Sequence, residues 1–126
     1  MNITRLIIFI SALHGAVGVA LAAAASHGAD KSPLLGTASQ FLMIHAACGL
    51  ALAAYLGSIA RNDRILVGSI ISMQLGATLF STDLVSRAYL GDRLFPFAAP
   101  LGGGLTLLAW ISLALWSLVH IRQKII

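Results

Sequence analysis

Charged residues are scarce in this sequence, and glutamate is absent altogether. Only 10% of the 126 residues are charged, against about 25% in an ordinary soluble domain. Eight Lys and Arg residues and four aspartates cannot cover the surface that a soluble fold of this size exposes. The composition therefore excludes a soluble domain, a disordered chain and a nucleic-acid-binding protein. We interpret the net charge of +4 as an excess of Lys and Arg that orients the protein in the membrane and contacts lipid headgroups.

Cysteine is nearly absent as well. The single cysteine, Cys48, excludes a disulfide framework and a cysteine-based zinc or iron–sulfur site. The familiar catalytic motifs are also missing: there is no Gly-x-Ser-x-Gly, no phosphate-binding Walker loop and no His-Glu-x-x-His. We therefore expect no enzyme activity.

Long apolar runs dominate what is present. Hydrophobic residues make up 59% of the chain, and a membrane-spanning helix needs about 20 mainly apolar residues. Helices are the expected spanning form, because unpaired backbone groups cannot face hydrocarbon. The sequence predicts an all-α integral membrane protein, with one domain over residues 1–126 that forms an antiparallel bundle of four transmembrane helices. The helices are expected at about residues 4–25, 37–60, 65–88 and 97–120.

Short segments with helix-ending residues separate the runs. The Ser-Pro pair at residues 32–33 is a favourable helix start, so the second helix is able to begin early. Asn62 or Asp63 can cap the third helix, and Gly91 is expected to end it. Pro100 is well placed to open the fourth helix.

The distribution of Lys and Arg predicts the orientation, because these residues favour the cytoplasmic side of a membrane. One side carries Arg5, Arg61, Arg64, Arg122 and Lys124, and the other carries Lys31, Arg87 and Arg93. We expect a multi-pass protein of the bacterial inner membrane with both termini in the cytoplasm. In a eukaryote the corresponding location is the mitochondrial inner membrane.

Small residues line the faces of the predicted helices. The candidate packing interface comprises Ser11, Gly15, Gly18 and Ala22 on the first helix and Gly102 and Gly103 on the fourth. Helices in lipid associate by close approach of their backbones, which small side chains permit. The simpler interpretation is packing within the chain, and the alternative is docking against another subunit.

Polar residues within a membrane span are costly and mark candidate functional sites. The outer half of the predicted bundle contains Gln40, His45, Asp83 and Arg87, with His27 at the end of the first helix. We take these five as a candidate ligand-binding pocket for a lipid headgroup, an ion or a proton. Asp83 and Arg87 are four residues apart and are expected to pair, so the alternative is a salt bridge that only anchors the helix. No metal site is expected, because the residues lack close ligand spacing.

Two histidines, His14 and His45, fall near the middle of the membrane on neighbouring predicted helices. Two facing imidazoles can ligate a haem iron, so a bis-His haem electron-transfer protein is one alternative. Faces rich in small residues pack too tightly to admit a porphyrin, so we expect no haem and no other cofactor, although bound lipid is compatible. Each histidine is instead expected to bond a backbone carbonyl or a neighbour such as Gln74.

Several segments occur in the order and spacing of a family of small membrane proteins. They are Ala22–His27, Phe41–His45, Leu79–Leu84, Pro100–Gly103 and the Ala109-Trp110 pair. On these segments the chain resembles the bacterial family known as domain of unknown function 423, which has eukaryotic relatives. The resemblance implies a four-helix integral membrane protein and no established enzyme activity.

The function that the sequence favours is that of a small non-enzymatic membrane protein. It would act as a structural or accessory subunit that packs with itself or with a larger membrane complex. One alternative is an oligomeric transporter or ligand-binding protein that uses the outer polar pocket, and the other is the haem protein. The expected partners are membrane lipids, together with a second copy or other membrane subunits, and nucleic acid is not among them.

Overall fold

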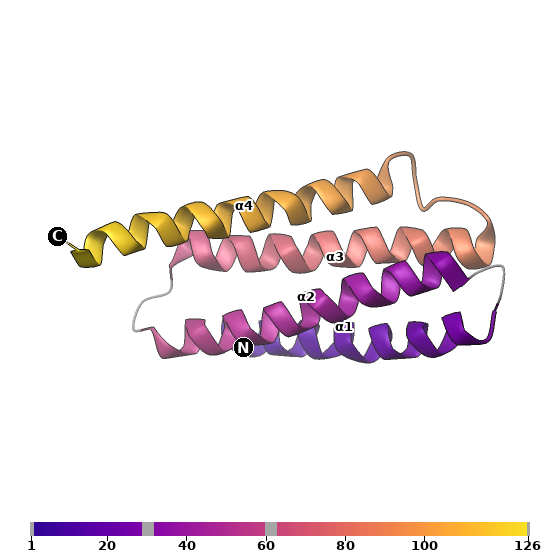
Figure 1. Cartoon of the computed structure of the whole chain (residues 1–126), viewed down its shortest axis with the longest axis horizontal. Coiled ribbons are helices and arrows are strands. Elements are labelled where there is room, and N and C mark those ends of the chain that lie inside the picture. Colours follow the sequence, from indigo (N-terminus) through magenta and orange to yellow (C-terminus); the bar gives the residue numbers. More distant parts are fainter. Residues whose placement is uncertain (1, 29–31, 60–62, 126) are drawn as a thin grey trace.

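Four long helices make up the computed structural model, which describes residues 2–28, 32–59 and 63–125, with Ser32 and 121–125 by backbone alone (Figure 1). They are α1 (Ile3–Ser26), α2 (Ser32–Ser58), α3 (Arg64–Leu90) and α4 (Ala98–Ile125). No strand occurs in these described ranges, so the all-α prediction is confirmed. The bounds differ most at two places: α2 begins at Ser32 rather than at 37, and α4 continues to Ile125 rather than 120.

Each helix is long and apolar enough to cross a membrane. The helices have 24 to 28 residues, and a helix rises about 1.5 Å per residue, so each exceeds a hydrocarbon core of about 30 Å. Large apolar side chains point away from the bundle: Phe9 is 58% exposed and Leu90 is 75% exposed. Surface of this kind needs a lipid environment, because water would not solvate it favourably.

The predicted ends of α3 are confirmed. Oδ1 of Asp63 accepts hydrogen bonds from the backbone N–H groups of Ile65 at 2.9 Å and Leu66 at 3.2 Å, so Asp63 is the N-cap. Gly91 ends the helix in the left-handed conformation, with φ of 78°, and its N–H donates to the carbonyl of Arg87. The other candidate cap, Asn62, lies outside the described residues.

Helix α4 starts one residue after the predicted bound at 97 and two residues before Pro100, the residue expected to open it. The helix begins at Ala98, and Pro100 lies within its first turn. Proline is tolerated there, because the N–H groups of the first turn make no intrahelical hydrogen bond. Phe97 precedes the helix with φ of 68°, a conformation that is uncommon for an aromatic residue. The chain thus turns sharply from the loop at residues 91–97 into α4.

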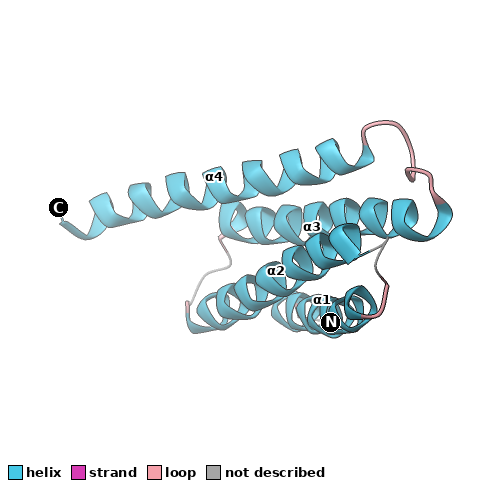
Figure 2. Ribbon diagram, turned by 45° about the vertical axis from the view of Figure 1, so that its right-hand side comes forward, coloured by secondary structure: helices cyan, strands magenta, loops and turns pink. Residues whose placement is uncertain are grey.

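Two antiparallel hairpins form the bundle. One consists of α1 and α2 and the other of α3 and α4, and they meet mainly where α2 packs on α3. Within the described residues the backbone of α4 approaches α3 alone, so α4 lies to one side of the other three helices (Figures 1 and 2). The predicted antiparallel four-helix arrangement is confirmed. We refer to its two ends as the Asp63 end and the Asp92 end.

Small residues let the helices of each hairpin approach closely. The carbonyl of Gly18 accepts a hydrogen bond from the Ser39 hydroxyl at 2.6 Å across the α1–α2 contact. In the other hairpin, a Cβ added to Gly102 would lie 2.5 Å from the backbone nitrogen of Phe80 and 2.8 Å from the carbonyl oxygen of Gly76. These contacts exist because no side chain separates the two backbones.

The candidate packing residues therefore lie at contacts inside this chain. Ser11, Gly18 and Gly102 are buried, and Gly15, Ala22 and Gly103 are half-buried. A Cβ on Gly15 would lie 3.7 Å from that of Ala46, and one on Gly103 would lie 3.7 Å from the ring of Phe80. Packing within the chain accounts for these residues, and docking of another subunit on them stays a prediction.

Two apolar clusters fill the interior, one toward each end of the bundle. The cluster nearer the Asp92 end contains Leu21, Leu35, Ala38, Leu42, Ala77 and Leu84. The cluster nearer the Asp63 end contains Ile7, Ala53, Leu56, Leu66 and Ile70. Between them, at mid-length, buried polar side chains such as Ser11, His14, His45 and Gln74 lie among the apolar Met73 and Ala46.

Candidate functional site

A layer of polar side chains crosses the bundle between the two apolar clusters. This midplane polar cluster consists of Ser11 and His14 from α1, His45 from α2, Gln74 and Thr78 from α3, and Trp110 from α4. His14 lies midway along α1, about 17 Å from each helix end at 1.5 Å per residue. In a membrane the cluster would lie near the centre of the hydrocarbon core, where polar groups are rare and costly.

Gln74 joins three helices through one amide group. Its Nε2 donates to the hydroxyl of Ser11 at 3.2 Å and to the backbone carbonyl of His45 at 3.0 Å. Gly49 of α2 makes this possible, because a Cβ there would occupy the space of the Gln74 amide and the Ser11 hydroxyl. Both amide hydrogens are thereby used, while the buried Oε1 can still accept a hydrogen bond.

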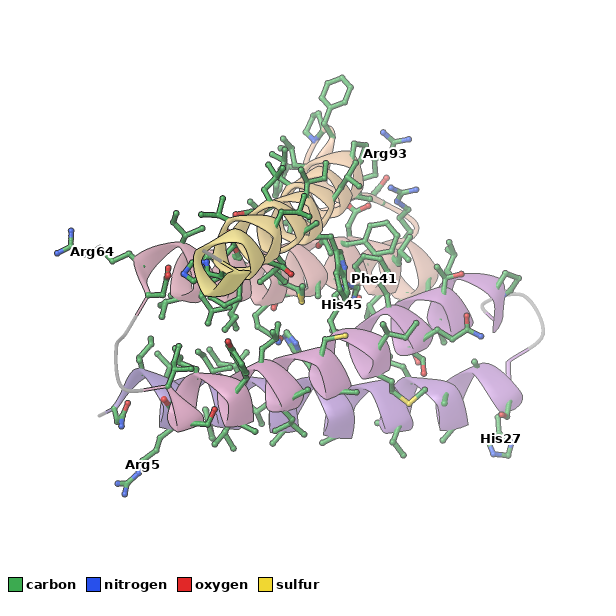
Figure 3. The ribbon with its side chains drawn as sticks, turned by 60° about the vertical axis from the view of Figure 1, so that its left-hand side comes forward. Arg5, His27, Phe41, His45, Arg64 and Arg93 are labelled. Carbon is green, nitrogen blue, oxygen red and sulfur yellow. The ribbon has the colours of Figure 1, made fainter. Side chains whose placement is uncertain are left out.

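The hydrogen bonds of His45 define its tautomer. Nδ1 donates to the carbonyl oxygen of Phe41 at 2.6 Å, since a carbonyl can only accept. Nε2 is then the acceptor of the neutral ring and receives the indole N–H of Trp110 at 3.3 Å. Figure 3 shows the Phe41 and His45 side chains together between α2 and the second hairpin. The expected histidine–carbonyl bond is confirmed here.

His14 pairs with Thr78, a residue that the sequence analysis did not single out. Nε2 of His14 and the Thr78 hydroxyl are hydrogen-bonded at 2.8 Å, and the same hydroxyl also bonds the backbone carbonyl of Gln74 at 2.8 Å. On the other side of the ring, Nδ1 of His14 is buried beside the Gln74 side chain, whose Oε1 is buried as well. The tautomer with a hydrogen on Nδ1 pairs these two atoms, because Nδ1–H can donate to Oε1.

The two midplane histidines face different partners. Nε2 of His14 bonds Thr78 on α3, whereas Nε2 of His45 bonds Trp110 on α4. A bis-His haem would require both of these nitrogens on one iron. Among the residues that the structure describes, no group of three His, Cys, Asp or Glu side chains is placed to hold a metal ion.

Asp83 forms the expected pair with Arg87 and also holds a loop. Its Oδ2 accepts from Nε of Arg87 at 2.8 Å and from Nη2 at 2.5 Å. Its Oδ1 accepts from the backbone N–H of Leu94 at 2.9 Å, and the carboxylate is fully buried. One turn along, the Ser86 hydroxyl donates to the carbonyl of Asp92 at 2.8 Å. These bonds fold the loop at residues 91–97 back onto the end of α3.

The structure does not bring the five candidate pocket residues together. The Phe41 and Phe80 rings lie side by side with centroids 4.3 Å apart. His45 is one turn from that contact toward the Asp63 end, and Asp83 is nearly one turn toward the Asp92 end. The two residues are therefore about 10 Å apart along the bundle at 1.5 Å per residue.

The remaining two members of the predicted pocket lie on the surface. Gln40 is exposed on α2, and His27 is exposed beyond the end of α1, where it points away from the bundle (Figure 3). The expectation of one shared pocket is therefore wrong in geometry: counting depth from the helix ends does not fix which way each side chain faces. Ligand binding by any of the five residues singly stays a prediction.

A second polar contact between helices occurs at the Asp63 end. Oδ2 of Asp63 accepts from the indole N–H of Trp116 at 2.8 Å, and Nε2 of His120 lies 3.4 Å from the same oxygen. The Trp116 hydrogen bond, with smaller contributions from the capped N–H groups and His120, lowers the pKa of the Asp63 carboxyl. The sequence analysis identified Asp63 only as a helix cap. It had no signal for the contact with α4, which joins residues 53 positions apart.

Four apolar helices with a polar layer at mid-length and charged residues at their ends define a multi-pass α-helical membrane protein. This chain belongs to the family described as protein of unknown function DUF423, which it matches over residues 21–103. It is also similar to a UPF0382 membrane protein of Haemophilus influenzae, with 34% identity over 109 residues, or 82% of this chain and 86% of that protein. No solved structure matches the chain. The family resemblance seen in the sequence is confirmed.

Proposed function

We propose that this chain is a small, non-enzymatic accessory subunit that packs against a transmembrane helix of a second copy or of a larger membrane complex. The observation that carries the proposal is an unfilled groove between α3 and α4. The proposal involves no cofactor, and membrane lipids cover the remaining apolar surface. It is favoured over transport through an outer pocket, because the five residues of that pocket are spread over the bundle.

The groove, which we call the α3–α4 groove, has the length of a helix–helix contact. It consists of two adjoining hollows of about 390 and 380 Å³ that share Ile65, Leu108 and Ser112. Its lining on α4 runs from Leu105 to His120, a span of about 22 Å at 1.5 Å per residue. A neighbouring helix could therefore lie along about four turns of α4.

The α3 side of the groove has the small side chains that close helix approach requires. Gly68 and Ser72 line it one turn apart, and Gly68 is exposed. A Cβ on Gly68 would meet no atom within 4 Å, in contrast to the crowded Gly76 two turns along the same helix. Gly76 is used inside the chain, whereas Gly68 is free for a partner.

This difference provides a test that does not disturb the fold. Gly68→Leu has room within the chain and should fold, but it would fill the α3–α4 groove. Gly36→Leu is the matched control, because Gly36 of α2 also has no atom within 4 Å of an added Cβ and lies outside the groove. We expect Gly68→Leu to weaken association measured by native mass spectrometry from lipid vesicles by about tenfold, or about 1.4 kcal/mol. Equal effects of the two variants, or monomers with no other membrane subunit bound, would reject the proposal.

We also propose that both termini face the cytoplasm. Figure 3 shows Arg5 and Arg64 at one end of the bundle and His27 and Arg93 at the other, in agreement with the predicted division of charge. Lys31 and Arg61 lie outside the described residues, and the side chains of 122 and 124 are not described. The Lys and Arg excess counted on the Arg5 side of the sequence supports the orientation.

Cysteine labelling tests this orientation. In a Cys48→Ala background, Arg93→Cys should react with an impermeant reagent added to intact cells, and Ser58→Cys should react only after the membrane is opened. The two positions flank α3 and lie at opposite ends of the bundle. The reverse pattern would place the termini outside.

A further inference from the structure

A second groove lies between α1 and α3, with α2 at its base. This α1–α3 groove has a volume of about 260 Å³. Its lining includes Leu13, Val17, Leu21, Leu42 and Val85, together with the hydroxyl-bearing Ser81 and Thr82 and the His14–Thr78 pair. It is separate from the α3–α4 groove and shares no lining residue with it.

The polar part of the α1–α3 groove lies deep in the membrane. His14 and Thr78 are near the middle of their helices, about 17 to 20 Å from the ends. Leu21 and Val85 are each about two turns, or about 10 Å, nearer the Asp92 end. The groove thus runs from a polar inner end at mid-membrane to an apolar outer part within one leaflet.

Every hydroxyl hydrogen in the groove is already donated to the protein. Thr78 donates to the carbonyl of Gln74, Thr82 to that of Thr78, and Ser81 to that of Ala38. Nε2 of His14 is used on Thr78. What remains for a guest is acceptor capacity on the threonine hydroxyl oxygens, both on exposed residues, because Nδ1 of His14 is buried out of a guest's reach.

The depth of these acceptors limits what can satisfy them. The headgroups of phospholipids stay at the membrane surface, too far away to reach the inner end of the groove, and acyl chains have no donor. A threonine hydroxyl oxygen that faces hydrocarbon finds no donor there, and a donor group brought by a guest would supply one. The best guest is therefore an apolar molecule with a small O–H group.

We propose that the α1–α3 groove binds a lipid-soluble phenol or alcohol, whose O–H donates to the hydroxyl oxygen of Thr78 while its apolar part lies along Val17, Leu21 and Val85. The same acceptor rejects a ketone, quinone or ether of the same shape, because these molecules bring only further acceptors. The proposal does not depend on the accessory role, since the two grooves are separate.

A matched pair of probes separates the hydrogen bond from simple partitioning. We would titrate 4-octylphenol and its methyl ether, 4-octylanisole, into the full-length ¹⁵N-labelled protein in phosphatidylcholine nanodiscs and follow the amide signals of Leu13 and Thr78. Saturable shifts are expected, with the phenol binding about tenfold more tightly than the ether. Equal affinity of the two probes, or an absence of saturable shifts with the phenol, would overturn the proposal.

Two pairs of variants locate the site. Val17→Trp should fill the groove and abolish saturable phenol binding, whereas Val19→Trp, at a more exposed position outside the groove, should not. Thr78→Val should bring the phenol-to-ether ratio close to one, whereas Thr37→Val should leave it unchanged. Thr37 is a matched control, because its exposed hydroxyl also donates to a backbone carbonyl one turn earlier.

These variants also keep the test decisive if one of them does not fold. Val17 is 47% exposed, so its replacement does not disturb the interior and decides the outcome even if Thr78→Val is unstable. Phenol binding that survives Val17→Trp, or that Val19→Trp removes equally, would show that the probe binds elsewhere and would reject the α1–α3 groove as the site.

Discussion

The indole N–H of Trp110 points at Nε2 of His45 across 3.3 Å, and the rings meet edge-on with centroids 6.2 Å apart. Among the described residues the backbones of α2 and α4 make no close approach, so side chains link the two helices: this hydrogen bond, and the edge-on contact of the Tyr55 and Trp116 rings with centroids 6.0 Å apart. The hydrogen bond also explains why His45 is held as one neutral tautomer, with Nδ1 committed to the Phe41 carbonyl.

Trp110→Phe should destabilise the protein by about 1 kcal/mol, because it removes the indole donor and leaves Nε2 of His45 without one. Reversible unfolding in mixed detergent micelles would measure the change. In a double-mutant cycle with His45→Phe, the effects should be less than additive if the lost hydrogen bond is the cause. Simple additivity would show that Trp110 acts through its apolar area alone.

Asp83→Leu should expose the loop at residues 91–97 to trypsin. The bond that trypsin cuts after Arg93 contains the same Leu94 N–H that Asp83 holds, so loss of the carboxylate should speed cleavage about tenfold or more. Asp83→Asn should behave close to the native protein, since its amide oxygen can still accept from Leu94. Asp92→Asn is the control, because Asp92 enters the loop contacts through its carbonyl. Unchanged cleavage in Asp83→Leu would contradict the loop role.

The Asp63 contact should make stability fall in acid. Because the pKa of the folded carboxyl lies below its ordinary value of 3.8, the unfolded chain binds the proton first as pH falls. The stabilisation is therefore complete above about pH 5 and is lost as pH drops through the lowered pKa. Asp63→Asn should remove this loss of stability in acid. Trp116→Phe should make the loss smaller, because the folded carboxyl then has a pKa nearer its ordinary value. Thermal unfolding between pH 6 and pH 2 would measure both, with Asp92→Asn as the control; an equal loss of stability in all three variants would refute the assignment.

Gly102→Ala should be far more damaging than Gly104→Ala, two residues along the same helix. The new Cβ at 102 would lie 2.5 Å from a backbone nitrogen of α3, which cannot move aside, whereas at 104 nothing lies within 4 Å. We expect a loss of about 1 to 3 kcal/mol for Gly102→Ala and no loss for Gly104→Ala, because alanine is the better helix former. Equal stabilities would mean that α4 can shift on α3 at no cost.

Features that depend on neighbours in the sequence were predictable. Four apolar runs of sufficient length give four helices, and the cap at Asp63, the stop at Gly91 and the Asp83–Arg87 pair follow from spacing within one turn. The small residues also indicated close packing. Whether that packing is internal or with another subunit could not be predicted, because it depends on where the neighbouring helices lie.

Contacts that depend on helix rotation were not predictable. Which side chains His14 meets is decided by how α1 and α3 face each other: the sequence predicted a backbone carbonyl or a neighbour such as Gln74, and the structure adds Thr78, which the sequence did not indicate. The expected outer pocket failed for the same reason, because residues at a similar counted depth can face different neighbours. The position of α4 to one side of the other three helices could not be predicted, because α4 is apolar on nearly all of its faces.

The division into two hairpins has a consequence for how the chain is made. Each hairpin closes its small-residue contacts between helices that are adjacent in the sequence, so each can pack as soon as its second helix has entered the membrane. The midplane amide of Gln74, in contrast, finds its acceptors only in the first hairpin, on Ser11 and on the His45 backbone. During biosynthesis the second hairpin thus carries an unsatisfied polar group into the bilayer, and meeting the first hairpin is what relieves it.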